Sequence, residues 1–133
     1  MFKMAIEGEL TDFRDGFFPN IGTGNQSAYN SVDAPLWFFW CIQQYAYINN
    51  ARTEVWNLYS KVMKQILDTF AEGTDNVRMD SNYLLWQSQS GKALTWMDAI
   101  VDGVPVTPRN GYAVEINALW YNAVMFYREL AEL

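Results

Sequence analysis

The feature that most constrains the fold is a run of apolar side chains with no polar face. From Trp37 to Ile42 the chain has Trp, Phe, Phe, Trp, Cys and Ile in unbroken succession, shortly after Pro35. Proline fits the first turn of a helix, where its missing amide hydrogen is not needed. We therefore expect a helix from Pro35 to about Tyr47. A helix that is apolar on every side must be covered all round, so we expect this one to be enclosed.

Two further helices are predicted from apolar residues at helical spacing. The clearer one runs from Thr53 to Phe70, with a polar entry at Asn49 and Asn50 and a stop at Gly73, a residue suited to a left-handed C-terminal turn. Its predicted buried stripe is Val55, Tyr59, Val62, Ile66 and Phe70, with Trp56, Met63 and Leu67 beside it. The other runs from about Ala113 to Glu129, with its predicted buried face formed by Ile116, Leu119, Trp120, Ala123, Val124, Tyr127 and Leu130.

The segment between these two helices has a different pattern. Residues 76–96 contain polar turns and predict a short β-hairpin or an irregular loop. Residues 102–111 contain two prolines and two glycines, so they cannot be helical throughout. No repeat or linker divides the chain. We therefore expect one all-α unit with long, ordered loops, which tend to be functional in a compact helical protein.

Charge and composition exclude several classes of function. Nine Lys and Arg against fifteen Asp and Glu give a net charge of −6, which repels nucleic acid. The chain has no histidine, so Ser-His-Asp and Cys-His catalysis and imidazole metal sites are excluded. No cofactor or metal is expected, and catalysis would depend on carboxylates.

Cysteine usage and hydropathy indicate a cellular compartment. The single cysteine, Cys41, rules out an internal disulfide, and its apolar neighbours predict a core thiol in a reducing compartment. The longest apolar stretch, 34–42, is too short to cross a bilayer, and residues 1–10 lack the apolar region of a secretory signal. We therefore expect a cytoplasmic protein with no membrane partner.

Asp33 lies at the threshold of the all-apolar helix and has two interpretations. It is either a helix-end cap or first-turn carboxylate, favoured by the backbone amides and the helix dipole, or a carboxylate at the mouth of an aromatic-lined pocket. In the second case it could bind two sugar hydroxyls while Trp37 or Tyr29 covers the apolar face of the ring.

Two more carboxylates stand beside apolar residues. Asp98 follows Trp96 and Met97; it either caps a short helical turn over residues 99–101 or is a partly desolvated general acid, since desolvation raises a carboxyl pKa. Glu115 is predicted at the edge of the buried stripe of the last helix, where it either pairs with Arg109 or contributes to a site.

Four stretches together carry a resemblance to a known family. In order they are "YNSVDAPLWFF", "DSNYLLW", "LTWMDA" and "VPVTPRNGYAVEINALWYNA". Over about residues 16–126 the chain resembles the C-terminal amylo-alpha-1,6-glucosidase domain of glycogen debranching enzymes. The resemblance implies part of an (α/α)6 barrel, whose loops at one end form a sugar site. It also implies glycogen or a limit dextrin as the bound glucan, and hydrolysis of its α-1,6-linked glucose stubs with inversion at the anomeric carbon.

The resemblance implies a role for each matching residue. Asp98 would be the general acid, and Asp33 would hold hydroxyls of the glucose before the scissile bond. Arg109 and Glu115 would line the same pocket. Trp37, Trp96 and Trp120 are candidate platforms for sugar rings, with a place in the core as the alternative for each.

An inverting glycosidase needs a second carboxylate, about 6.5–9.5 Å from the acid, to activate water. In the family that base is a glutamate far beyond the "VEINALWYN" helix. We therefore expect residues 1–133 to form one partial domain that carries the acid half of the site, is inactive alone and self-associates through exposed apolar helix faces. The alternatives are a non-catalytic α-glucan-binding domain and a helical interaction domain.

Overall fold

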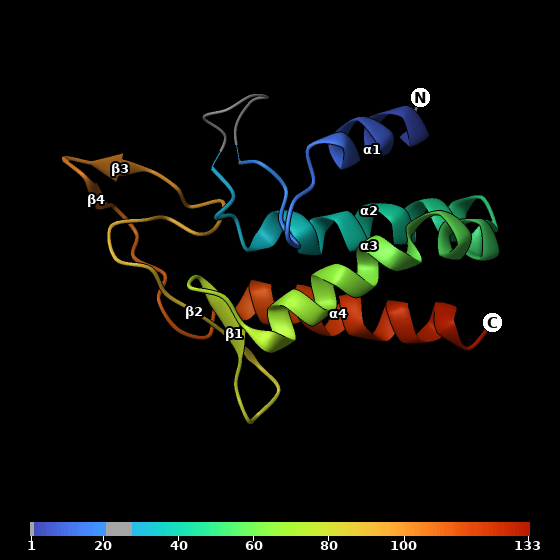
Figure 1. The fold of residues 1–133 in the computed structure, drawn as a ribbon. Coiled ribbons are helices and arrows are strands. Elements are labelled where there is room, and N and C mark those ends of the chain that lie inside the picture. Colours follow the sequence, from blue (N-terminus) through green and yellow to red (C-terminus); the bar gives the residue numbers. More distant parts are fainter. Residues whose placement is uncertain (1, 21–27) are drawn as a thin grey trace.

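The computed structural model describes residues 2–20 and 28–133, and this part of the chain is mainly helical (Figure 1). Its helices are α1 (Phe2–Thr11), α2 (Asp33–Ile48), α3 (Arg52–Glu72) and α4 (Val114–Ala131). The last three confirm the predicted helices, with ends shifted by one to two residues. The sequence analysis does not predict α1; among residues 3–11, Ile6 is buried, Lys3 and Leu10 are half-buried, and the others are exposed.

Two antiparallel hairpins complete the described chain. Strands β1 (Val77–Met79) and β2 (Leu85–Gln87) pair with Val77 opposite Gln87, which confirms the hairpin predicted there. Strands β3 (Ile100–Val101) and β4 (Val104–Pro105) form the second hairpin. The helical turn considered over residues 99–101 is therefore wrong, and Asp98 caps no helix. Both hairpins lie at the end of the molecule where α2 and α4 begin and α3 ends (Figure 1).

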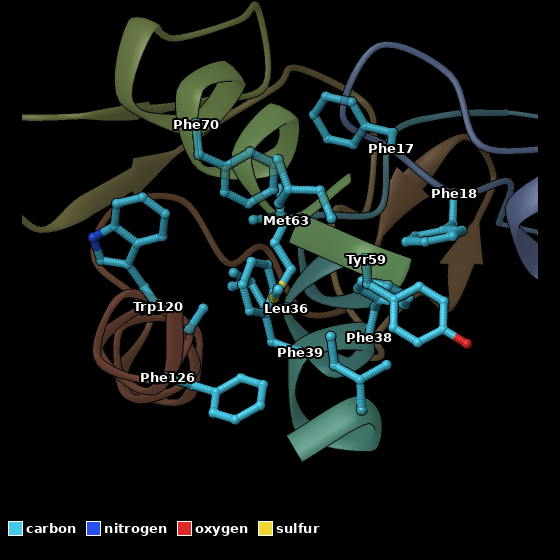
Figure 2. Packing of buried hydrophobic residues seen from close by; sticks show 14 of the residues in the cluster. Phe17, Phe18, Leu36, Phe38, Phe39, Tyr59, Met63, Phe70, Trp120 and Phe126 are labelled. Carbon is cyan, nitrogen blue, oxygen red and sulfur yellow. The ribbon is translucent and has the colours of Figure 1, made fainter. Parts of the chain in front are cut away.

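The core lies between α2, α3 and α4, since α2 packs against both of the others. Figure 2 shows side chains from all three helices converging: Leu36, Phe38, Phe39, Tyr59, Met63, Phe70, Trp120 and Phe126. On α3 the fully or nearly fully buried residues match the predicted stripe, except that Met63 replaces Val62 as a buried member. On α4, Phe126 is buried and the predicted Val124 is 38% exposed.

The described residues do not cover α2 on every side. Trp37 is 47% exposed and Trp40 is 43% exposed, while Leu36, Phe39 and Ile42 on the opposite face are fully buried. The helix therefore has one core face and one uncovered apolar face. No charged residue occurs between positions 34 and 51, so this uncovered face has no acidic or basic side chain.

The two asparagines before α3 have a different role from the predicted one. Asn49 is the C-cap of α2, and Asn50 adopts a positive φ of 51° in the turn, so Ala51 is the N-cap of α3. Asparagine tolerates this left-handed geometry better than most residues. The predicted stop is confirmed: Gly73 is the C-cap of α3, with φ of +93°.

Candidate functional site

Asp33 is the first residue of α2 and connects this helix to a distant loop. Its side chain is buried, with 6% exposure. The backbone N–H of Trp96 donates to Asp33 Oδ2 at 3.0 Å, and the hydroxyl of Ser31 donates to Oδ1. Beside them the Val32 N–H donates to the Leu94 carbonyl at 2.8 Å. Asp33 is thus a first-turn carboxylate, as one interpretation expected, but it holds the 94–96 loop and makes no side-chain cap to its own helix.

The bound loop, α2, α1 and residues 18–20 line two adjoining open hollows, which we call together the Asp33 cleft. The larger, about 450 Å³, has the rings of Trp37 and Trp96 and the carboxylate of Asp33 in its wall. The smaller, about 200 Å³, shares Asp33 and Trp96 with it and adds Asp98. The structure therefore brings together four predicted site residues, Asp33, Trp37, Trp96 and Asp98.

Asp98 occupies the open rim of the smaller hollow. Its side chain is exposed and its neighbour Trp96 is 63% exposed. The sequence suggests that Trp96 and Met97 shield the Asp98 carboxylate from water. The described residues leave this carboxylate exposed instead. A carboxylate at such a rim can reach a large substrate that extends out of the hollow.

Arg109 and Glu115 form an ion pair next to the cleft. Arg109 Nη2 donates to Glu115 Oε2 at 2.6 Å, and Nη1 contacts Oε1. Burial favours a higher pKa for Glu115, but the Arg109 guanidinium and a hydrogen bond with the Trp96 side chain oppose it, and the net pKa is lowered from 4.5. Neither residue is among those lining the two hollows, so the structure does not bring this pair into the cleft with Asp33 and Asp98.

Three other residues singled out by the sequence lie in the core or make contacts within the fold. Trp120 is core, with 6% exposure and a stacked contact to Phe70. Tyr29 donates its hydroxyl to the Asp12 carbonyl at 2.9 Å and lies outside the lining of the Asp33 cleft. Cys41 is half-buried instead of core and lines the larger hollow, where burial raises its thiol pKa.

Several supporting residues were not predicted. Thr95 is 5% exposed and lines the smaller hollow, and its hydroxyl has no hydrogen-bond partner among the described residues.

Two buried or half-buried amide side chains hold the neighbouring loops. Gln87 is fully buried; its Nε2 donates to the Arg109 carbonyl at 2.9 Å, and its backbone pairs in both directions with Gly111. Asn117 pairs in both directions with the backbone of Leu85. The partners of Gln87 and Asn117 are far away in the sequence, so no local pattern reveals them.

Residues 2–20 and 28–133 offer neither a metal site nor a membrane-spanning helix. No cluster of three or more cysteine, aspartate or glutamate side chains there could hold a metal ion. Within the same residues, no helix combines the length and the apolar character that crossing a membrane requires.

Comparison with known proteins gives the family. The family model described as amylo-alpha-1,6-glucosidase matches residues 3–133, and the chain therefore belongs to the amylo-alpha-1,6-glucosidase family. This family suggests a glycoside hydrolase of the debranching type. Neither the curated proteins nor the solved structures contain a match to the chain.

Proposed function

We propose that this chain forms the acid side of a site that hydrolyses α-1,6-glucosidic branch stubs in glycogen or a related α-glucan. The observation that carries the proposal is that Asp33, Trp96 and Asp98 line one hollow in a chain of this family. Asp98 is the proposed general acid. Its exposed carboxyl stands at the rim, where the glucan that leaves the reaction would extend into solvent.

The walls of the cleft suit a glucose ring. The indoles of Trp37 and Trp96 offer flat surfaces for the C–H face of the sugar, and both are partly exposed. A carboxylate has about four lone-pair positions, so Asp33 can accept a sugar hydroxyl in addition to Ser31 and the Trp96 N–H. Asp33 therefore has two proposed roles: it binds hydroxyls and it fixes the loop that carries Trp96 and Asp98.

The proposed reaction uses the Asp98 proton. As the bond between the anomeric carbon and the glycosidic oxygen breaks, Asp98 donates its proton to that oxygen, and the shortened glucan leaves. Water adds to the opposite face of the anomeric carbon and gives its proton to a second carboxylate. Glucose is released with inverted configuration.

We propose that the second carboxylate comes from outside these 133 residues. Of the other carboxylates at or beside the cleft, Asp33 already holds Ser31 and Trp96 and Glu115 is paired with Arg109, while Glu9 lines only the larger hollow, which Asp98 does not line. A general base must be free to accept a proton from water. On this proposal the chain is one part of an (α/α)6 barrel and binds glucan without releasing glucose.

The test compares binding and turnover in the same samples. Tryptophan fluorescence during titration with a limit dextrin should show saturable binding, and Asp33→Ala should weaken it about tenfold or more, since a hydrogen bond to a charged group contributes about 1.5–3 kcal/mol. Asp68→Ala, on the exposed face of α3, is the matched control and should bind like the parent chain. Absence of binding, or glucose release that Asp98→Asn abolishes, would contradict the proposal.

A second candidate function is favoured by the uncovered face of α2. Trp37 and Trp40 are exposed there within a segment that has no charge, and such a face is typical of an interface. We propose that two copies associate through this face.

A further inference from the structure

The larger hollow of the Asp33 cleft is lined mainly by apolar and aromatic side chains. Its volume, about 450 Å³, lies within the range of roughly 300–1,000 Å³ usual for small-molecule sites. The buried rings of Phe18 and Phe38, whose centroids lie 5.4 Å apart, line it from the core, and the exposed indoles of Trp37 and Trp96 line it nearer the solvent. The hollow therefore offers a ligand mainly aromatic surface.

We infer that the larger hollow binds a small organic cation, an ammonium group carried on an apolar alkyl or aryl body. This ligand is not a sugar, so the inference goes beyond the proposed function and does not depend on it. Three observations support it: the acidic character of the polar lining, the lack of basic partners for these acids and the exposed indole faces.

The charged side chains of the hollow are acidic. They are Glu9 and Asp33, and no lysine, arginine or amide side chain from residues 2–20 or 28–133 lines it. Ionised carboxylates only accept hydrogen bonds, and an ammonium group supplies both donors and a positive charge. This lining therefore favours a cation over a neutral or anionic ligand with the same apolar body.

Neither carboxylate has a basic partner within the described residues. Asp33 is 6% exposed, and the Ser31 hydroxyl and the Trp96 N–H that bind it are both neutral. Glu9 is exposed, and the ion pairs of the described residues include neither Glu9 nor Asp33. A buried charge is costly unless it is paired, so a cation in the hollow would supply the positive charge that the lining lacks.

The two exposed indoles provide a second kind of contact for an ammonium group. The face of an aromatic ring attracts a cation, and tryptophan does so most strongly. Trp37 is 47% exposed and Trp96 is 63% exposed, so both rings are open to a ligand in the hollow. The apolar body of the same ligand would face the rings of Phe18 and Phe38.

Isothermal titration calorimetry with benzyltrimethylammonium tests the inference, and benzyl alcohol serves as the neutral ligand with the same ring. We expect saturable binding of the cation, with benzyl alcohol about tenfold weaker. Added salt should weaken binding of the cation and leave the alcohol unchanged, because salt screens charge attraction. Equal affinity for the two ligands, or no binding of benzyltrimethylammonium to the parent chain, would overturn the inference.

Two pairs of variants locate the site. Glu9→Gln should weaken binding of benzyltrimethylammonium about two- to fivefold; Glu7→Gln, exposed on the same helix but outside the lining, is the matched control. Trp37→Ala should weaken it at least as much, and Trp40→Ala is its control, because Trp40 is similarly exposed on α2 and does not line the hollow. Thermal unfolding checks the folding of all four variants. Equal losses in the variants and their controls would overturn the inference.

Titration of the parent chain with a limit dextrin separates this inference from the proposed function. A chain that binds the dextrin but not benzyltrimethylammonium would overturn the inference and leave the proposed function intact. A chain that binds benzyltrimethylammonium but not the dextrin would support the inference and contradict the proposed function.

Discussion

The carboxylate of Asp33 joins two parts of the chain that are 63 residues apart in sequence. Removing it by Asp33→Ala leaves the Trp96 N–H and the Ser31 hydroxyl without their acceptor. We expect the free energy of unfolding to fall by about 1–3 kcal/mol, the usual cost of an unsatisfied buried group. Urea denaturation measures this loss. Asp68→Ala should change stability by less than about 0.5 kcal/mol, and an equally small effect of Asp33→Ala would contradict the role of Asp33 in holding the loop.

The ion pair of Arg109 and Glu115 predicts a pH dependence of stability. The pKa of Glu115 in the folded chain is lowered from 4.5, so the folded state favours the ionised carboxylate. Its stabilising contribution is complete above the ordinary pKa and is lost as the pH falls through the lowered one. The parent chain should therefore exceed Glu115→Gln in unfolding free energy at neutral pH, and this difference should shrink in acid. If the difference in unfolding free energy between the two chains stays constant or grows below pH 4.5, the ion pair is not its cause.

At the scale of elements, α1 is connected to the helical core through the turn at residues 14–17. Gly16 has φ of +87°, and a Cβ there would lie 2.6–2.9 Å from side-chain atoms of Thr69 on α3. Gly16→Ala should lower the unfolding free energy by about 1–3 kcal/mol, through backbone strain and the clash.

Gly8→Ala is the matched control for this change, because Gly8 lies within α1 and nothing lies within 4 Å of its added Cβ. Alanine there should stabilise the helix by roughly 0.5–1 kcal/mol. Thermal unfolding of both variants measures the contrast. If Gly16→Ala is as well tolerated as Gly8→Ala, the close packing of this turn on α3 is wrong.

The elements also show what sequence can predict here. Helices α3 and α4 are predictable because their apolar residues repeat at helical spacing, and α2 because an unbroken apolar run follows a proline suited to a first helical turn. The first hairpin is predictable because polar turns interrupt residues 76–96. Helix α1 is not predictable in this way, because most of its described side chains are exposed. At the site, the sequence indicates Asp33 and Asp98, but it does not indicate that Asp33 binds the Trp96 N–H or that Gln87 holds the Arg109 loop. These contacts depend on loops that only tertiary packing brings together.

For the whole molecule, the uncovered face of α2 predicts association. Sedimentation velocity at tens of micromolar should show a dimer, and Trp40→Lys should shift the chain to monomer, because a lysine cannot be buried there without a partner. Leu58→Lys replaces a residue that is 52% exposed on α3 and should leave the dimer unchanged. A parent chain that is strictly monomeric would contradict association through α2.

On our proposal, the two hollows of the Asp33 cleft, lined by Asp33, Asp98, Trp37 and Trp96, bind glucose residues of an α-glucan. The most direct test is the NMR signal of the six tryptophan indole N–H groups during titration with a limit dextrin. We expect the signals of Trp37 and Trp96 to move most, while the signal of Trp56, which packs on Tyr127 and does not line the cleft, stays in place. Unchanged signals for Trp37 and Trp96 at saturating dextrin would contradict the proposal.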